Sequence, residues 1–462
     1  MNCSIVWLRD DLRMTDNPAL NAATETGDPV VVVFILDEVS PRIRPLGSAT
    51  KWWLNHSLVS LSESLETLGS KLILRSGQST KIIEDLVAQT NAKNVFWNRR
   101  YGKPERDIDS NLMKSLREKN VVVDSFHANL LFEPWDVRTG NNGPYTVFTP
   151  FWKNCINQQP TPRLPFVAPK QINSPLNLPE SEDLNSWNLL PEIDWAKGFT
   201  QRWTPGETGG HNKLENFLKG RIKQYADGRD FMSLESTSEL SPHLRWGEVS
   251  PFQIWHAAEQ HRKNNIEDSK NVTKFLAEVG WREFSYHLHY HWPDLATKNF
   301  DSRFDHFPWA KTDPKILRAW QRGETGIELV DAGMKELWQT GYMHNRARMV
   351  VASFLIKNLL HDWRLGEEWF WDTLVDADSA NNAASWQWVA GSGADAAPYF
   401  RVFNPELQAE KFDPASEYRN RYLGDNRAEQ IIDLGESRKR ALEAFAELSD
   451  IPRSIRPPVV DY

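Results

Sequence analysis

The chain has 462 residues, of which 40% are hydrophobic and 25% are charged, and its formal net charge is −8. These values are typical of a globular protein with two or three domains. They exclude a uniformly basic nucleic-acid binder, so any DNA site must be a local group of Arg and Lys side chains.

Residues 1–135 alternate strand-length and helix-length segments. The expected strands are Ile5–Leu8, Val30–Leu36, Lys71–Leu74, Val95–Trp97 and Val121–Val123. Helix-length segments lie between them at Ser48–Leu68, Thr80–Gln89 and Pro104–Lys119. Apolar strands joined by helices predict a parallel α/β sheet. No G-x-G-x-x-G or P-loop glycine pattern follows the first strand, which argues against ordinary nucleotide binding there.

The regular pattern ends near Asp136, and prolines recur as far as about Gly210. We interpret residues 136–210 as a long interdomain connector that lies partly ordered against the body of the protein. The segment VFTPFWKN, residues 147–154, is expected to dock as a short helix near its start.

From His211 to about Leu423 the strand signals disappear, so residues 211–462 are predicted to form a large all-helical domain. Ser241-Pro242 and Ser250-Pro251 each resemble a helix N-cap followed by proline at the first helical position. The tail is expected to add one charged helix, Glu436–Leu448, and a proline-rich end. No apolar run exceeds strand length, so the sequence predicts no transmembrane helix.

Asp378, Asn382 and Trp386 lie four residues apart, so a helix would place a carboxylate, an amide and an indole on one face. A tryptophan in a helix is more often a packing residue, and a helix end at the surface could also hold these polar groups. Buried carboxylates need partners, however. This face is therefore a poor core and a good support for a polar aromatic cofactor that accepts an electron.

Three further polar sets lie in the helical half. Two have the spacing of one helical face, and the third, a hydroxyl-rich segment at a helix start, suits a phosphate. The sets are Glu278 with Trp281 and Arg282, Asn345 with Arg348 and Met349, and Thr237–Ser241. Each set alone is better explained by a capped helix, a surface ion pair or a satisfied buried Arg. Their presence in one domain favours a functional site.

Longer motifs carry a family resemblance. VWLRDDLRMTDNPAL opens the chain, and TSELSPHLRWGEVSP, WREF, GYMHNRARMVVASFL, DWRLGEEWFWDTLVDADSANNAASWQW and AAPYFRVFNPELQAEKFD follow in that order. The chain resembles the photolyase/cryptochrome family over nearly its full length, in particular bacterial photolyases of class I or III that repair cyclobutane pyrimidine dimers. The resemblance implies a Rossmann-like antenna domain in residues 1–135 and an all-helical domain that holds FAD in a U-shaped conformation.

The resemblance assigns cofactor and electron-transfer residues. Those that would bind FAD are Tyr225, Thr237, Ser238, Glu239, Leu240, Ser241, Arg348, Asp376, Ala377, Asp378 and Asn382. In this assignment Tyr225 and Thr237–Ser241 hold the phosphates, and Asn382 faces flavin N5. Arg348 pairs with Asp376. The electron relay to the protein surface comprises Trp386, Trp363 and Trp309.

The resemblance also assigns a substrate cavity. The catalytic residues would be Glu278, Trp281, Asn345, Met349, Asn382 and Trp388. DNA would be bound by Lys153, Arg229, Glu278, Trp281, Arg282, Asn345, Arg346, Arg401 and Gln408. Trp281 and Trp388 would stack on or border a flipped dimer, as aromatic side chains commonly do with flipped bases. Light would drive an electron from reduced FAD to the dimer and back, so no metal is expected.

Three alternatives are weighed, two within the family and one beyond it. Repair of the (6-4) lesion is disfavoured because Asn345 follows His344 and Met349 lies one turn on. A cryptochrome blue-light receptor is the runner-up, although plant-type receptors tend to carry Asp, and insect-type ones Cys, where this chain has Asn382. The chain also has no long disordered C-terminal extension. The third hypothesis is an adenine-nucleotide enzyme that uses the α/β domain. The absence of a glycine-rich loop after the first strand argues against it.

An antenna chromophore is implied as well. We expect 5,10-methenyltetrahydrofolate, with 8-hydroxy-5-deazaflavin as the alternative. Glu105 matches an acidic position that contacts folate in part of the family, although Pro104 replaces the usual Asn. Trp52 and Trp53 are possible stacking partners for a pterin elsewhere on the domain, with helix packing favoured for both.

The two cysteines, Cys3 and Cys155, provide neither a disulfide framework nor a metal-ligand set. The N-terminus lacks the apolar run of a secretory signal, and free thiols fit a reducing compartment. We therefore expect a cytoplasmic monomer without membrane attachment, whose partner is UV-damaged DNA containing pyrimidine dimers.

Overall fold

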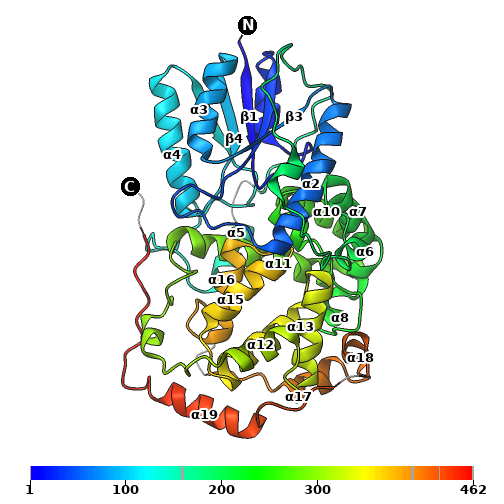
Figure 1. The fold of residues 1–462 in the computed structure, drawn as a ribbon, viewed down its shortest axis with the longest axis vertical. Coiled ribbons are helices and arrows are strands. Elements are labelled where there is room, and N and C mark those ends of the chain that lie inside the picture. The colour runs from blue at the N-terminus through cyan, green and yellow to red at the C-terminus, as the bar shows by residue number, and fades with distance from the viewer. Residues whose placement is uncertain (1, 158–160, 397–399, 426, 460–462) are drawn as a thin grey trace.

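The computed structural model describes residues 2–157, 161–396, 400–425 and 427–459. The chain forms two lobes: an α/β lobe built from the first part of the sequence and an all-helical lobe built from the rest (Figure 1). Five strands form one sheet in the α/β lobe, and they are β1 (Ser4–Leu8), β2 (Val30–Leu36), β3 (Leu72–Ser76), β4 (Asn94–Asn98) and β5 (Val122–Phe126).

The sheet is parallel throughout, with the strand order β3-β2-β1-β4-β5. The strand order changes side between β1 and β4: β2 and β3 extend the sheet on one side of β1, and β4 and β5 extend it on the other. Val6 of β1 lies opposite Val32 of β2 and Phe96 of β4. In such sheets ligands bind beyond the carboxyl ends of the strands at this switch point. All five strands predicted from the apolar runs are present.

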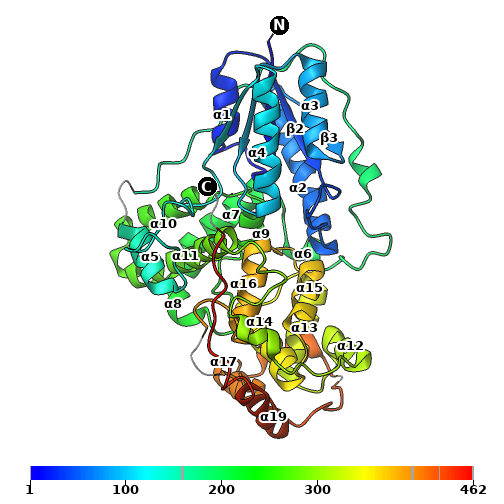
Figure 2. The same ribbon diagram turned by 90° about the vertical axis from the view of Figure 1, so that its left-hand side faces the viewer.

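Helices cover both faces of the sheet (Figure 2). They are α1 (Pro18–Glu25), α2 (Ser48–Thr67), α3 (Ser79–Thr90) and α4 (Lys103–Glu118). Alternate strand residues point to opposite faces. Val6 and Val32 therefore pack with α1 and α2, whereas Ile5 and Val31 pack with α3 and α4. Burial on both faces explains why the strands are continuous apolar runs.

The predicted connector lies along the α/β lobe for much of its length. Its first part forms α5 (Phe148–Asn157), the expected short helix, which packs on the helical lobe. Backbone hydrogen bonds then join Ile172 to Leu68 and Glu182 to Leu74. Residues 158–160 of the predicted connector lie outside the described residues. Short helical segments follow at η1 (Leu184–Trp187) and α6 (Phe199–Arg202), before α7 (Glu207–Lys219).

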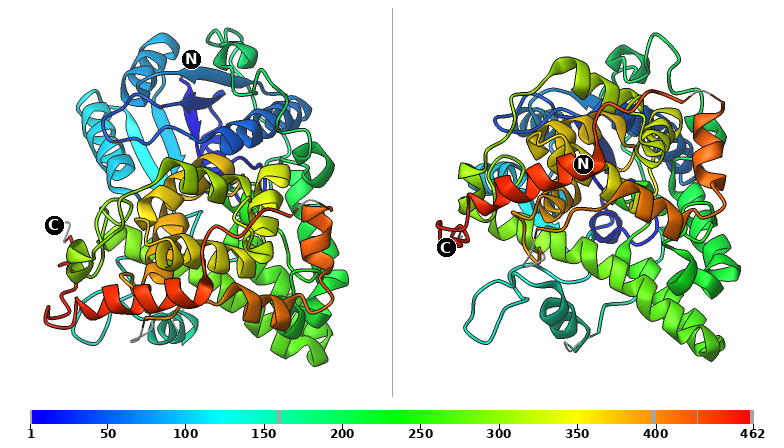
Figure 3. Two further views of the ribbon diagram at one scale, coloured as in Figure 1. Left: turned by 60° about the horizontal axis from the view of Figure 1, so that its bottom comes forward. Right: turned by 90° about the horizontal axis from the view of Figure 1, so that it is seen from below.

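The main body of the helical lobe begins with α7. Its further elements are η2 (Arg221–Gln224), α8 (Tyr225–Gly228), α9 (Ser241–Arg245), α10 (Pro251–Asn264), η3 (Ile266–Asp268), α11 (Ser269–His291), η4 (Ser302–His306), α12 (Pro314–Arg322), α13 (Glu328–Thr340), α14 (Asn345–Ser353), η5 (Phe354–Asn358), α15 (Trp363–Thr373), α16 (Ser379–Ala390), α17 (Pro405–Phe412), α18 (Glu417–Leu423) and α19 (Leu434–Ala446). The expected charged tail helix is α19, which lies across the end of the lobe farthest from the sheet (Figure 3).

The two predicted helix starts have different outcomes. Ser250 caps α10 as expected, with a reciprocal capping box to Gln253. The expectation for Ser241 is wrong, because α9 begins at Ser241 itself and Leu240 occupies the cap position. The Ser241 hydroxyl is therefore not a cap, and it donates instead to Asp376.

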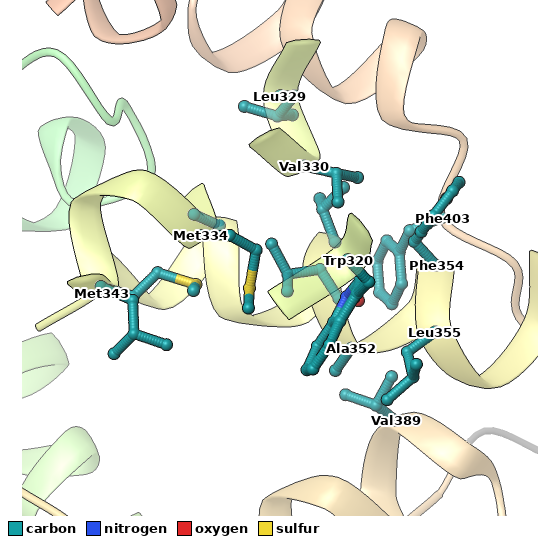
Figure 4. Packing of buried hydrophobic residues seen from close by; sticks show 14 of the residues in the cluster. Trp320, Leu329, Val330, Met334, Met343, Ala352, Phe354, Leu355, Val389 and Phe403 are labelled. Carbon is teal, nitrogen blue, oxygen red and sulfur yellow. The ribbon is translucent and has the colours of Figure 1, made fainter. Parts of the chain in front are cut away.

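A large apolar cluster fixes the helices of the helical lobe relative to one another. Trp320 of α12 is fully buried in it and lies beside Leu355 and Val389, which come from η5 and α16 (Figure 4). Burying aromatic rings of this size is a major stabilising contribution. No helix in the described part of the chain is long and apolar enough to cross a bilayer.

Polar contacts join the two lobes. Glu283 on α11 accepts hydrogen bonds from the backbone N–H groups of Leu131 and Phe132. Burial raises the pKa of Glu283 to about 7, although Arg282 opposes the shift. Close backbone contact adds to these bonds: a Cβ on Gly47 would lie 2.1 Å from the carbonyl oxygen of Trp371. The lobes are thus fitted closely enough to fix any site that lies between them.

Candidate functional site

A cavity of about 490 Å³ lies within the helical lobe, lined by residues of α8, α11, α14, α15 and α16. This volume falls within the range of small-molecule sites. All six residues predicted to be catalytic line it, namely Glu278, Trp281, Asn345, Met349, Asn382 and Trp388. Other predicted site residues on its wall are Arg229, Arg346, Arg348, Asp376, Ala377, Asp378 and Trp386. Four segments that are distant in sequence thus converge on one hollow.

Helix α16 supplies the face that the spacing of Asp378, Asn382 and Trp386 predicts. Asp378 is its N-cap and accepts hydrogen bonds from the backbone N–H groups of Ala380 and Asn381 through Oδ1. Its other oxygen, Oδ2, accepts a hydrogen bond of 2.5 Å from the hydroxyl of Tyr286. Asp378 is therefore held from both sides, and all three predicted residues line the cavity.

Asn382 is oriented by a chain of contacts from the other lobe. Its Nδ2 donates to both the backbone oxygen and Oε1 of Glu367, each at 2.9 Å. Glu367 in turn forms a bidentate ion pair with Arg44 of the α/β lobe, at 2.8 and 3.0 Å. Because Nδ2 is engaged, the carbonyl oxygen of Asn382 is the group left to face the cavity. Sequence reasoning did not identify Glu367 or Arg44 in this role.

Asp376 and Arg348 form the ion pair that the resemblance predicts. Arg348 Nη2 lies 2.9 Å from Asp376 Oδ2, and the same oxygen accepts a hydrogen bond of 2.6 Å from the Ser241 hydroxyl. Burial lowers the pKa of Arg348, but Asp376 outweighs it, and the pKa is raised.

One atom of this pair bears on the expected cofactor. Asp376 Oδ1 is buried at the cavity wall and has no hydrogen-bond partner among the described residues. Buried polar atoms without partners are rare and costly, so this oxygen calls for a donor from a bound molecule. A flavin nucleotide, with its ring N–H and ribityl hydroxyl groups, offers such donors next to apolar surfaces. The residues present therefore fit FAD.

The expected phosphate-binding residues are not part of the cavity wall. Tyr225 is buried between Phe217 and Phe275, although the neighbouring Ala226 lines the cavity. Thr237–Leu240 also lie off the wall, and only Ser241 connects to it, through Asp376.

The side chain of Glu239 in that segment is engaged in ion pairs, and its predicted contact with FAD stays a prediction. Its carboxylate contacts Arg202 and Lys213, both at 2.7 Å, and Arg221 at 3.2 Å. Burial opposes ionisation, but Arg202 and Lys213 outweigh it and lower the pKa of Glu239 to about 2. The Glu239 carboxylate is thus the centre of an ion-pair cluster with three cations. Any cofactor contact from this residue must come from its backbone.

The predicted relay tryptophans belong to, or pack against, the core cluster around Trp320. Trp386 lines the cavity, whereas Trp363 is fully buried and donates from Nε1 to Asn299. Trp309 is partly buried and packs on Phe307, with ring centroids 4.4 Å apart. Trp386 thus reaches the cavity and Trp309 is the most exposed of the three, while the electron relay itself stays a prediction.

Charged side chains form a connected chain at the cavity. Glu278 pairs with Arg229 and, at 3.1 Å, with Lys274. Asp230 pairs with Arg346 at 2.9 Å and lies 4.0 Å from Arg229 Nε. All five line the cavity. With Arg348, Asp376 and Asp378, the cavity wall holds four cations and four carboxylates, so it is balanced in charge although the protein as a whole is acidic.

Two predicted stacking residues also lie at the cavity. The Trp281 ring is stacked on Phe148 of α5, with centroids 3.8 Å apart and an interplanar angle of 11°. Trp388 donates from Nε1 to the backbone oxygen of Asp395 at 3.1 Å. One face of Trp281 is thus already covered, and both indoles are held in fixed orientations, which lowers the entropic cost of stacking a base on them.

Arg282 is not on the cavity wall, contrary to the face expected from its spacing. It donates to the backbone oxygen of Asn129 and stacks over the ring of Tyr286, both at the junction of the lobes. Arg282 is only 40° from Glu278 around the helix axis, on the side opposite Trp281, so the edge of the cavity wall falls between Glu278 and Arg282. The predicted DNA-binding residues Lys153, Arg401 and Gln408 also lie off the wall, on α5, the segment before α17, and α17.

Glu105 lies at a second, smaller cavity of about 130 Å³ at the switch point of the sheet. Arg9, Asp10 and Arg100, which follow β1 and β4, line it with Glu105. Trp53 is fully buried and Trp52 nearly so, which agrees with the packing that was favoured for both. A larger open groove, of about 820 Å³, lies between α7 and α10 and includes none of the predicted site residues.

Several residues that contact the predicted site residues were not identified from the sequence. They are Arg44, Asp230, Arg245, Tyr286, Trp320 and Glu367. A signal for Asp230 and Glu367 was present in the sequence, since Asp230 follows the predicted Arg229 and Glu367 lies within the motif that begins DWRLGEEW. Arg44 and Arg245 become relevant only once the lobes meet, so no local pattern identifies them.

Comparisons with known proteins agree with this geometry. Residues 4–170 match the family model "DNA photolyase", and residues 275–430 match "FAD binding domain of DNA photolyase". The chain is 48% identical to a deoxyribodipyrimidine photo-lyase of Agrobacterium fabrum, over 96% of this chain and 97% of that protein. It is 35% identical to the Escherichia coli enzyme of the same name, over 92% and 90%.

Solved structures give the same result. The crystal structure of a class III photolyase from Agrobacterium tumefaciens superposes with a TM-score of 0.93 at 47% identity, covering 97% of this chain and 98% of that one. A Synechocystis cryptochrome superposes with a TM-score of 0.87 at 27% identity, covering 96% and 99%.

Proposed function

The chain belongs to the photolyase/cryptochrome family, and from this premise we propose that it is a deoxyribodipyrimidine photo-lyase, which splits cyclobutane pyrimidine dimers in DNA with light. The observation that carries the proposal is the cavity itself. It joins every predicted catalytic side chain to a buried carboxylate oxygen, Asp376 Oδ1, that lacks a partner among the described residues. A site that holds both a cofactor and a flipped-out pyrimidine dimer needs this combination.

The cofactor is FAD. Arg348, Asp376 and Asp378 would hold its polar groups, and the carbonyl oxygen of Asn382 would face its ring. When bound in the reduced state, FAD supplies the light-driven electron that opens the dimer. The side chains fix the geometry: Asp378 and Asn382 are each held by hydrogen bonds from behind, so they need no reorganisation during the reaction.

The other end of the cavity would receive the flipped dimer. Trp281 and Trp388 are rigid aromatic surfaces that can border the two pyrimidine rings. Glu278 and Asn345 are the polar groups placed to bond the thymine edges. Arg229 and Arg346 supply positive charge for the DNA backbone on either side of the lesion. The apolar wall formed by Met349 and its neighbours excludes water from the reacting rings.

Glu278→Ala is expected to slow repair about tenfold while FAD remains bound, because a hydrogen bond to a charged group contributes roughly 1.5–3 kcal/mol. The measurement is the loss of the dimer from a UV-irradiated oligonucleotide under blue light, with flavin absorbance giving cofactor content. Glu215→Ala is the matched control, because Glu215 is an ion-paired glutamate on α7, away from this cavity. An unchanged repair yield in Glu278→Ala would remove the assigned role. No repair by the unaltered protein would remove the proposed function.

The receptor alternative is disfavoured by the site. Asn382 stands at the position where the resemblance gives plant-type receptors Asp and insect-type ones Cys. The matched relatives include Cryptochrome-1 of Arabidopsis thaliana, 37% identical over 91% of this chain and 62% of that protein. We propose a monomeric enzyme of the cytoplasm whose partner is UV-damaged DNA. Cys3 and Cys155 are both free and buried, as a reducing compartment allows.

We propose 5,10-methenyltetrahydrofolate as the antenna pigment, with 8-hydroxy-5-deazaflavin as the alternative. The cavity beside Glu105, at about 130 Å³, is smaller than ordinary ligand pockets of roughly 300–1,000 Å³. A better platform continues outward from Trp52, which contacts Phe199 and through it Trp195. The ring centroids of Trp195 and Trp338 lie 5.9 Å apart, and the Trp338 side chain is half-exposed. The half-exposed ring of Trp338, beside the partly buried Trp195, is a surface on which a flat pterin could stack.

Trp338→Ala is expected to abolish an absorption band beyond that of flavin in the purified protein, because the stacking surface is lost. Glu105→Ala should leave that band in place. The measurement is the near-ultraviolet and violet spectrum at matched flavin content. The reverse result would place the antenna at the switch point of the sheet, beside Glu105.

A further inference from the structure

In the DNA-free protein, the arginines at the cavity are already occupied by carboxylates. Arg346 pairs with Asp230, and Arg229 pairs with Glu278 and lies 4.0 Å from Asp230. Asp230 follows α8 directly and is the acid shared between the two arginines. A carboxylate and a phosphate offer an arginine the same pair of anionic oxygens. The cavity therefore carries its own substitute for a DNA phosphate.

We propose that Asp230 competes with the DNA backbone for Arg229 and Arg346 and so limits how tightly the protein binds any DNA. This inference rests on the proposed function, because it concerns the same site. Asp230 would act through the two arginines, which makes it a positioning residue. Its effect is to keep the enzyme from being held on intact DNA.

Exposure and packing support the exchange. The side chain of Asp230 is 39% exposed, whereas those of Arg229 and Arg346 are 11% and 15% exposed. An aromatic ring packs against each arginine. The guanidinium carbon of Arg346 lies 4.3 Å from the ring centroid of Phe412, and that of Arg229 lies 5.4 Å from the ring centroid of Tyr225. The acid is thus the outermost member of the group. An incoming phosphate can displace it without moving the buried parts of the arginines.

The exchange has a consequence for Glu278. A phosphate that takes Arg229 also removes the partner of the Glu278 carboxylate, which leaves Lys274 as its ion-pair partner. Backbone binding therefore frees Glu278 to turn to the thymine edge. The free energy needed to displace Asp230 is the same for intact and for damaged DNA, so Asp230 lowers the affinity for both equally. The ratio of the two affinities is set by the lesion bound in the cavity.

Asp230→Asn tests the proposal through DNA binding in the dark, where no repair occurs. The dissociation constants for an intact duplex and for one with a thymine dimer should both fall about fivefold, because an exposed ion pair contributes up to about that factor. Their ratio should stay constant. The slope of log affinity against log salt should steepen by up to roughly 0.9, since each additional phosphate contact releases one counterion.

Asp227→Asn is the matched control. It lies three residues away, removes the same charge, and pairs with Lys270 in solvent, outside the cavity. Asp230→Glu should restore the original affinity and salt slope, which a merely structural role of the side chain would not require. Flavin content and thermal unfolding show whether the variants are folded.

Two results would overturn the inference. If Asp227→Asn strengthens binding as much as Asp230→Asn, the effect is one of overall charge. If Asp230→Asn weakens binding, the acid holds the arginines in place for DNA. A wild-type protein without preference for the dimer-containing duplex would instead refute the proposed function, which is a separate outcome of the same measurement.

Discussion

Replacing Arg348 with methionine should yield a folded but less stable protein that purifies nearly free of flavin. The change leaves the Asp376 carboxylate buried with only the Ser241 hydroxyl as a partner. Removing one member of a buried ion pair costs roughly 3–5 kcal/mol, because the remaining charge is uncompensated. Arg348 also donates from Nε to the backbone oxygen of Met343, so the loop before α14 loses a support. The same atoms would hold the cofactor, so stability and flavin affinity should fall together.

Flavin absorbance at matched protein concentration and the midpoint of thermal unfolding measure the two effects. Arg427→Met is the control, because Arg427 pairs with Glu328 at the surface, where an ion pair contributes at most about 1 kcal/mol. If Arg348→Met retained a full complement of flavin, the cofactor could not depend on this ion pair, and the placement of FAD against Asp376 would be wrong.

Replacing Trp386 with phenylalanine is expected to reduce the photoreduction of oxidised flavin about tenfold or more, which corresponds to at least about 1.4 kcal/mol in the activation barrier. Trp386 is the predicted relay residue on the cavity wall, so an electron from Trp363 or Trp309 must pass it. Phenylalanine keeps an aromatic ring beside Phe370 but is far harder to oxidise than indole. Packing should therefore survive while the electron path does not.

The bleaching of oxidised flavin under blue light with an external reductant measures this effect. Repair by enzyme reduced chemically beforehand should remain near normal, because the relay only restores the active redox state. Trp292→Phe is the control, since Trp292 is a buried indole that packs on Phe300 and donates to the backbone of Arg456, off the cavity wall. Unchanged bleaching in Trp386→Phe would show that electrons reach the flavin by another route.

The site shows which of its features can be predicted from the spacing of residues along the sequence. The spacing of Asp378, Asn382 and Trp386 correctly predicted a shared face, because a helix repeats every 3.6 residues whatever surrounds it. The same rule did not suffice for Arg282, which lies only 40° from Glu278 about the helix axis and yet donates to Asn129 of the other lobe. A three- or four-residue spacing states which residues are neighbours, but it cannot state where the boundary between cavity and interface falls.

Glu239 and Ser241 show a second limit. Their motif resembled a capped helix start with free N–H groups, yet Glu239 is drawn to Arg202, Lys213 and Arg221. Ser241 enters the helix instead of capping it. Both outcomes depend on cations or carboxylates from distant segments. The helix α1 was not identified either, although Asn17 caps it and Pro18 opens it.

The sequence by itself determined the parallel sheet, because its strands are buried on both faces and so read as continuous apolar runs. It also determined the helical lobe and the residues of the cavity that recur at helical spacing. Only the tertiary structure decided how charges pair across the cavity and between the lobes, as in Arg44 with Glu367 and Asp230 with Arg346. Periodicity is a property of neighbouring residues, whereas an ion pair depends on the distance between segments that the sequence places far apart.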